Sequence, residues 1–356
     1  MSEHKVSAEL GAAREDAQFG FEGERQLAFE FTGDAQEYFR IWIVNLSLTL
    51  VTFGLFSPWA KVRKKRYFYS HTLLDGSPFQ YLGKPIPILK GRLVAAALVV
   101  TWWAVAHLVP EFAILLFVAG AVLLPWVVVR SAAFNARYSA YRNMTFRFAG
   151  TYWSFVRELI GSALLTVVTC YLAFPWLRAR FTRYLVSRTS FGGVPAQFFR
   201  VGGDLAASYL ISYACMVGTV GSSIVLFKAF HSPVASVKAL QNITYVAYVA
   251  YFLVFVFLKA RIDNIVWTGT GLGGLSFEST LRFRELLWVY FSNSVAVLCS
   301  AGLLVPWAVI RVAKYRAAHF GVVATGSLAQ FQGSDRSAVQ ATGAEVGEFF
   351  DLDLSL

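Results

Sequence analysis

Long apolar runs, separated by short polar and charged stretches, dominate the chain between residues 41 and 307. Seven runs approach the length of about 20 helical residues that crosses the hydrocarbon core of a bilayer. They occupy residues 41–59, 93–109, 112–129, 158–176, 205–227, 243–258 and 286–307. The pattern predicts an α-helical integral membrane protein with about seven hydrophobic segments.

Four of the runs end in one six-residue signature, Pro-Trp-x-x-x-Arg, and an aromatic residue follows each arginine four positions later. Trp prefers the headgroup level of a membrane, and an arginine one turn further on reaches lipid phosphate. In all four copies the cation is Arg, although Lys stands nearby, which favours a directed contact within the repeat. The predicted lipid-headgroup residues are Trp59, Trp126, Trp176, Trp307, Arg63, Arg130, Arg180 and Arg311, with Arg261 from an altered copy that lacks Pro-Trp.

The signature belongs to a longer repeat. An Asn or Ser stands thirteen residues before three of the prolines, a Thr or Ser stands six before, and similar aromatic stretches lie further upstream. Self-similarity of this kind indicates repeated units, and an odd number of spans in a repeat gives inverted topology. The predicted divisions are an acidic tail at 1–28, three-segment units at 29–144 and 145–275, a half unit at 276–333 and an acidic tail at 334–356.

Short stretches rich in Thr, Gly and aromatic residues follow the basic patches at 71–81, 188–199 and 267–277. Alternation broken by Asp-Gly or Gly-Gly is typical of a β-hairpin, so these stretches predict short hairpin-like elements at the membrane surface. Gly269, Gly271 and Gly274 match a dinucleotide-binding pattern. That pattern needs a preceding buried strand, whereas a membrane segment precedes it here, which favours hairpin turns.

Two topologies compete. If all seven segments cross, the N-terminus lies outside, and the Trp residues that bracket segments 41–59, 158–176 and 286–307 mark both membrane faces. If those three segments re-enter, all Lys and Arg except Lys228 and Lys238 fall on one side, which satisfies the positive-inside rule far better. The paired Trp belts favour seven crossings.

Several polar side chains lie inside the repeated segments, where an unpaired polar group is costly. They either line a solute pathway, with Asn45 and Asn293 facing each other, or form hydrogen bonds between helices. The set comprises Asn45, Thr49, Thr52, Thr166, Thr169, Asn293 and Ser300.

Composition supports the membrane assignment. Hydrophobic residues make up 56% of the chain, charged residues 15%, and the mean hydropathy is +0.53. The net charge of +11 comes from cations beside apolar runs, so we expect a bilayer with anionic lipid headgroups as the partner and no nucleic acid. No catalytic set, cofactor motif or metal-spaced cluster is evident, and we expect neither enzymatic activity nor a cofactor.

The stretches from Tyr38 to Tyr67, from Asn264 to Trp267 and from Glu285 to Arg311 resemble the YjgN family of bacterial inner-membrane proteins. The resemblance covers about residues 29–333 and implies a multi-pass protein of the bacterial inner membrane. It implies no activity, because no biochemical function is established for that family.

Two functional hypotheses follow. In the first, the protein handles lipid or a small amphipathic solute between its repeats without catalysis. In the second, it is a membrane scaffold that presents basic surface elements and an acidic C-terminal tail to a protein partner. A cavity between the repeats would favour the first hypothesis, and a solid helical bundle would favour the second.

Overall fold

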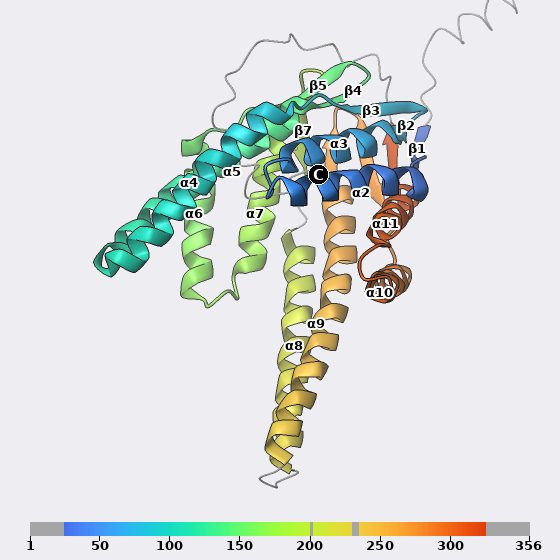
Figure 1. Ribbon diagram of the computed structural model, residues 1–356. Helices are drawn as coiled ribbons and strands as arrows, with labels where there is room; N and C mark the ends of the chain where they lie inside the picture. Colours follow the sequence, from blue (N-terminus) through green and yellow to red (C-terminus); the bar gives the residue numbers. More distant parts are fainter. Residues whose placement is uncertain (1–24, 200–201, 230–234, 325–356) are drawn as a thin grey trace, which may run out of the picture.

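A computed structural model describes residues 25–199, 202–229 and 235–324 of the chain (Figure 1). Within these ranges, ten short strands form one closed antiparallel barrel, and pairs of helices leave it. The predicted acidic tail at 334–356 and most of the one at 1–28 lie outside the described residues.

The described elements follow one order five times: a strand, two helices and a second strand. The strands are β1 (Arg25–Phe31), β2 (Thr72–Leu74), β3 (Ser77–Tyr81), β4 (Ser139–Tyr141), β5 (Met144–Phe148), β6 (Thr189–Phe191), β7 (Val194–Phe198), β8 (Thr270–Leu272), β9 (Leu275–Ser279) and β10 (Phe320–Ala324). The helices are α2 (Ala35–Val51), α3 (Ser57–Ser70), α4 (Pro85–Leu108), α5 (Ala113–Tyr138), α6 (Tyr152–Val168), α7 (Phe174–Ser187), α8 (Gly202–Ala229), α9 (Ala235–Thr268), α10 (Phe283–Cys299) and α11 (Val305–His319), with a 3-10 turn η1 (Pro110–Phe112).

Two-residue turns join the units. Both central residues have positive φ in each of the four turns, at 75–76, 142–143, 192–193 and 273–274. This is the type I′ geometry, whose twist matches that of the flanking strands. The three hairpins predicted from Asp-Gly and Gly-Gly are present, and the structure has a fourth, unpredicted one at Arg142-Asn143.

The hairpins are not separate surface elements, as the sequence had suggested, because each pairs with its neighbours. Strand β1 pairs with β10, with Arg25 opposite Ala324 and Leu27 opposite Val322, so the first and last described strands close the barrel. Closure gives every strand two partners and removes the exposed edges that a lone hairpin would leave.

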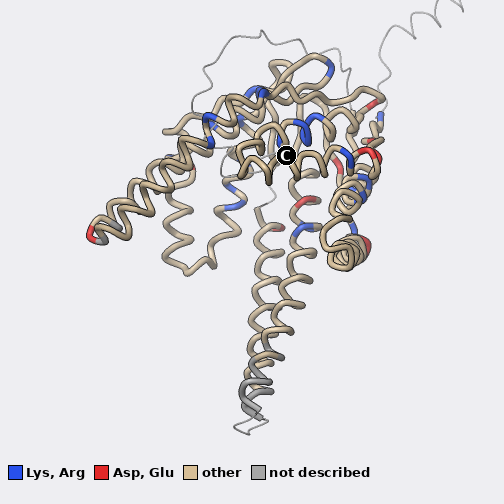
Figure 2. Tube along the Cα trace, viewed as in Figure 1, with Lys and Arg blue, Asp and Glu red and all other residues tan. Residues whose placement is uncertain are grey.

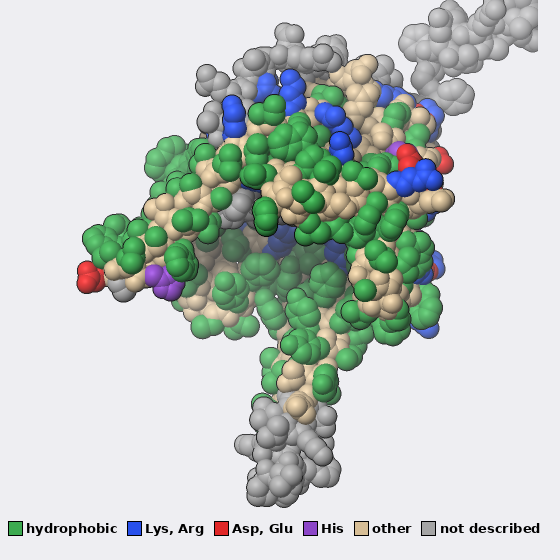
Figure 3. All heavy atoms as spheres, in the orientation of Figure 1, with side chains coloured by type: hydrophobic (Ala, Val, Ile, Leu, Met, Phe, Trp, Pro, Cys, Tyr) green, Lys and Arg blue, Asp and Glu red, His purple; other side chains and the backbone are tan. Residues whose placement is uncertain are grey.

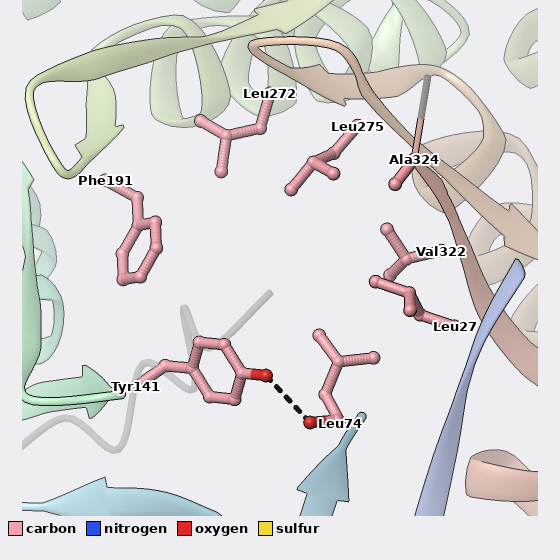
Figure 4. Close-up of a cluster of buried hydrophobic side chains, with 8 residues drawn as sticks. All are labelled: Leu27, Leu74, Tyr141, Phe191, Leu272, Leu275, Val322 and Ala324. Atoms are coloured by element: carbon pink, nitrogen blue, oxygen red, sulfur yellow. Dashed lines mark hydrogen bonds between the residues drawn. The ribbon is translucent and has the colours of Figure 1, made fainter. Parts of the chain in front are cut away.

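Alternate residues of the short strands point inward and fill the barrel with apolar side chains (Figure 4). The Tyr141 hydroxyl donates a hydrogen bond of 2.7 Å to the Leu74 carbonyl oxygen inside this core. The central cluster consists of Leu27, Leu74, Tyr141, Phe191, Leu272, Leu275, Val322 and Ala324.

Two helix pairs are long enough to cross a membrane, and α8–α9 reaches furthest from the barrel in Figure 1. By length and composition, four described helical stretches qualify: Pro85–Leu108, Ile114–Tyr138, Gly202–Val225 and Thr244–Thr268. They match four of the seven predicted segments, so the chain is helical and crosses the membrane several times.

The other three segments are not continuous helices, so the predicted count of seven spanning helices is not confirmed. Residues 41–59, 158–176 and 286–307 each contain a turn between two short helices, α2–α3, α6–α7 and α10–α11. Positive φ angles at Phe53-Gly54, Cys170-Tyr171 and Ala301-Gly302 reverse the chain there. The spacing of Trp residues does not reveal the turn: the first Trp of each pair lies on the first helix, and the second lies in the first turn of the second helix, beside the reversal.

The reversal also explains the repeated prolines. Pro58, Pro175 and Pro306 lie in the first turn of α3, α7 and α11, where the missing N–H of proline costs no hydrogen bond. Pro125 instead lies inside α5. The Pro-Trp signature therefore occupies two structural settings.

Candidate functional site

The five repeated arginines occupy the same level in their units. Each lies on the second helix of its pair, nine residues before the first residue of the strand that follows (63 and 72, 130 and 139, 180 and 189, 261 and 270, 311 and 320). At 1.5 Å per residue this places each about 13 Å along its helix from the barrel. We call Arg63, Arg130, Arg180, Arg261 and Arg311 the arginine tier.

Two members of the tier contact the first helix of their own pair. Arg311 Nη1 donates hydrogen bonds of 2.6 Å to Ser292 Oγ and 3.2 Å to Asn293 Oδ1, and its guanidinium lies 5.2 Å from the centre of the Trp307 ring. Asn293 Nδ2 in turn donates a 3.1 Å bond to the Ala308 carbonyl. The buried Asn293 of α10 is thus hydrogen-bonded to α11 twice, through the Arg311 side chain and the Ala308 carbonyl oxygen.

The first unit repeats this arrangement more loosely. Arg63 Nη1 lies 3.5 Å from Asn45 Oδ1, and the guanidinium lies 5.4 Å from the Phe56 ring centre. Asn45 and Asn293 therefore do not face each other; each is used inside its own helical hairpin. In the third unit Ser162 takes the asparagine position, and its shorter side chain bonds to the Leu159 carbonyl.

The remaining tier arginines, Arg130, Arg180 and Arg261, are exposed. Among the described residues, none of the five tier arginines forms an ion pair with a carboxylate. The tier is therefore a set of five positive charges whose neutralising partner is not a described side chain.

The other polar residues predicted inside the segments serve the helices and their turns. Thr52 and Thr169 each donate to a carbonyl four residues earlier and accept from a backbone N–H four residues later, and Ser300 accepts similarly from Leu304 N–H. These bonds satisfy the backbone N–H of the N-cap residue just before each second helix, at Phe56, Ala173 and Leu304. Thr49 and Thr166 donate to carbonyls one turn back, at Asn45 and Ser162.

The helix pairs contact one another around the barrel axis: α2 with α11, α3 with α4, α5 with α6, α7 with α8, and α9 with α10. Figure 3 shows the molecule hollowed below the barrel, between the α2–α3 pair in front and the helices behind, with Lys or Arg side chains visible inside the hollow. In Figure 2 these cations gather around the barrel and on the nearby parts of the helices. This arrangement can accept an anionic group attached to an apolar body.

A second repeated cluster, which the sequence analysis missed, fixes the junction of helices and barrel. Tyr315 Oη contacts the Arg282 backbone and lies 3.4 Å from Glu285 Oε2, while His319 Nε2 lies 3.2 Å from that same oxygen. The first unit repeats it: Tyr67 Oη donates to the Asp34 carbonyl at 2.9 Å and Glu37 Oε2 at 3.3 Å. There His71 Nε2 lies 3.7 Å from Glu37 Oε2.

The third unit replaces histidine by arginine at this junction. Tyr184 Oη bonds to Ser154 Oγ at 2.8 Å and to the Thr151 carbonyl at 3.1 Å, and Arg188 pairs with Glu158 at 2.5 Å. The ion pairs of His71 and His319 require a protonated imidazole, whereas that of Arg188 is permanent. The signal in the sequence is the aromatic residue four positions after the repeated arginine, with a basic residue four positions later.

Burial also changes the chemistry of the tyrosines at this junction. It raises the pKa of Tyr38 to about 12, and it raises the pKa of Tyr67 and of Tyr315 above the ordinary value of 10. The fold therefore favours the neutral phenol. The contribution of these neutral tyrosines to the free energy of unfolding is fully present below pH 10. It is lost as the pH rises through the raised pKa of the folded state.

We expect Tyr38→Phe to make unfolding less sensitive to alkali. Its ring stacks on Tyr67 at 5.2 Å, and phenylalanine keeps that packing. The free energy of unfolding of the unaltered chain should fall between about pH 10 and pH 12 by up to about 1.4 kcal/mol more per pH unit than that of the variant. Denaturant unfolding in neutral detergent measures this, and the same comparison at pH 8 isolates the packing effect. Equal alkaline slopes would contradict it.

No group of three or more His, Cys, Asp or Glu side chains suited to hold a metal occurs in the ranges that the structure describes. The three cysteines of the chain are free thiols on the protein surface. They are Cys170, Cys215 and Cys299.

Comparison with known proteins places the chain in a family. A family model described as "Bacterial protein of unknown function (DUF898)" matches residues 26–349. Inner membrane protein YjgN of Salmonella typhimurium strain LT2 is 29% identical over 119 residues, which are 33% of this chain and 30% of that protein. Its namesake in Escherichia coli O157:H7 is 28% identical over 136 residues, 35% of this chain and 33% of that protein.

The namesake in Escherichia coli K12 is 41% identical over a shorter stretch of 54 residues, 15% of this chain and 14% of that protein. The chain thus matches a third or less of the length of each of these relatives, and no solved structure matches it. The predicted resemblance is confirmed, and so is the inner-membrane location that the relatives and the long apolar helices indicate. The chain belongs to the DUF898 family of bacterial proteins and is a multi-pass inner-membrane protein of the YjgN kind.

Proposed function

We propose that this protein binds anionic lipid headgroups at the arginine tier and handles lipid without catalysing a reaction. One observation carries the proposal. Five arginines share one position in five successive units, and none forms an ion pair with a described carboxylate. Cations close to a membrane surface contribute about 1 kcal/mol each to the attraction of anionic lipid, and five at one level add together.

The surroundings of the tier suit a lipid better than a soluble anion. The hollow below the barrel in Figure 3 lies among helices whose exposed side chains are mostly apolar. A phosphate near the tier would leave the acyl chains among such helices, with no polar group buried unpaired. Each of the five units would then supply part of one binding surface.

We propose that the barrel faces the cytoplasm. Helices α4–α5 and α8–α9 both begin and end at the barrel, so their turns lie on the other side of the membrane. Of the 28 Lys and Arg residues that the structure describes, Lys228 and Lys238 stand at the far turn of α8–α9, and the remaining 26 belong to the barrel side. The positive-inside rule assigns that side to the cytoplasm.

Charge removal at the tier tests the function. We expect Arg130→Gln, Arg180→Gln and Arg261→Gln in one chain to weaken binding of phosphatidylglycerol roughly 100-fold, because three cations at about 1 kcal/mol each are lost. These three arginines form no side-chain hydrogen bond with any residue that the structure describes, so the fold should persist. Binding is measured in nanodiscs of neutral lipid that contain a small fraction of phosphatidylglycerol.

The matched control removes three exposed cations that lie outside the tier, Lys84, Arg147 and Arg284, in the same way. If the lipid binds at the tier, the control variant keeps its affinity for phosphatidylglycerol. If only the net charge of the protein matters, both variants lose affinity equally. A scaffold would bind phosphatidylglycerol no better than neutral lipid even without substitution, and that result would reject the proposal.

A further inference from the structure

We propose that the three short helical hairpins, α2–α3, α6–α7 and α10–α11, insert into the barrel-side leaflet and end at or before the bilayer midplane. The partner of their exposed apolar ends is thus the acyl-chain layer of one leaflet. The inference depends on the membrane location of the chain and not on headgroup binding by the tier.

Distances along the helices set the depth. Charged arginines of the tier stay at headgroup level, because a guanidinium in the hydrocarbon core is costly. From Arg63 to Phe53, from Arg180 to Tyr171 and from Arg311 to Gly302 there are nine or ten residues. At 1.5 Å per residue the hairpin ends therefore lie at most about 15 Å below the tier, whatever the tilt of the helices. This is half of a hydrocarbon core of about 30 Å.

The same measurement separates the long hairpins from the short ones. From Arg130 back to Glu111, in the α4–α5 turn, there are nineteen residues, or about 29 Å of helix. From Arg261 back to Ala235, the first residue of α9, there are twenty-six residues, or about 39 Å. Both lengths suffice to cross the hydrocarbon core, whereas the short hairpins reach only about half of that thickness.

The short hairpins end in side chains that fit lipid. Phe53 is 98% exposed, and Val168 and Leu298 are each 79% exposed on the protein surface. Further exposed apolar residues surround them in all three turns: Leu50, Val51, Leu55, Val167, Leu172, Leu303 and Leu304. The backbone of each turn is hydrogen-bonded internally, with the Thr52, Thr169 and Ser300 hydroxyls as acceptors. A turn whose backbone polar groups are hydrogen-bonded internally can enter an apolar medium.

Insertion of this kind makes the two leaflets unequal. In the described part of the chain, ten helices would occupy the barrel-side leaflet and the four long ones would occupy the opposite leaflet. Six additional helices of about 10 Å diameter fill on the order of 500 Å². The protein would therefore expand one leaflet relative to the other around itself.

Native cysteines test the depth directly. Cys170 lies in the turn of α6–α7 and Cys299 ends α10, and both are exposed on the protein. Chains that retain only one of them are reconstituted in vesicles of neutral phosphatidylcholine and treated with a membrane-impermeant maleimide from either side. A cysteine-free chain with Glu111→Cys is the control for a crossing hairpin. The neutral lipid keeps the result independent of headgroup binding at the tier.

We expect Cys170 and Cys299 to react at least tenfold more slowly in the bilayer than in detergent, from both sides. Glu111→Cys should react promptly from the side opposite the barrel. Prompt labelling of either native cysteine from the opposite side would show that its hairpin crosses, and prompt labelling from the barrel side would show that it does not insert. Either result would overturn the proposal.

Discussion

Phe191→Ala is expected to lower the free energy of unfolding by about 3 to 5 kcal/mol, the range for removing a buried aromatic ring. Phe191 points into the barrel, where its ring lies 4.7 Å from that of Phe146 and 6.3 Å from that of Tyr141. The barrel closes only if its short strands share one apolar core. The loss is measured as the change in denaturant unfolding in neutral detergent.

Gln197→Ala is the matched control, because Gln197 lies on the neighbouring strand β7 and is exposed. Its removal should change the unfolding free energy by less than about 0.5 kcal/mol. If the two variants were equally stable, the apolar interior would not be what holds the barrel together.

Arg311→Lys is expected to destabilise the chain by about 1.5 to 3 kcal/mol in detergent that contains no anionic lipid. The guanidinium donates to both Ser292 and Asn293 while it packs on Trp307. A lysine ammonium lacks the planar group that makes these contacts together, and it leaves the buried Asn293 oxygen without its donor. Arg63→Lys should follow with a smaller loss, because its contact with Asn45 is longer.

Arg180→Lys provides the control. Arg180 is exposed, and in its own helix pair Ser162 stands where the other two short pairs have an asparagine. This variant should melt like the unaltered chain. Unchanged melting of Arg311→Lys as well, with only anionic-lipid binding reduced, would contradict the directed contact and leave a diffuse electrostatic role for every tier arginine.

The candidate site was partly predictable. The five arginines are visible in the sequence, including Arg261, whose unit lacks Pro-Trp. Their common distance from a barrel strand could not be seen, because the strands were expected to be isolated hairpins. The pairing of Asn45 with Arg63 and of Asn293 with Arg311 also escaped prediction, since residues eighteen apart become neighbours only after the chain reverses between them.

The sequence by itself determined the membrane location, the four long apolar helices and three of the four β-turns, because each depends on a local run of residues or on a residue pair such as Asp75-Gly76. The tertiary structure decided which apolar segments are single long helices and which are helical hairpins. Segment 41–59 has the length and the Trp spacing of a crossing helix, yet positive φ at Phe53 and Gly54 folds it into two short helices. It also decided that strands as far apart as β1 and β10 pair. Strands of three to seven residues carry too little pattern to specify partners, and only closure of the barrel, which satisfies every edge at once, selects them.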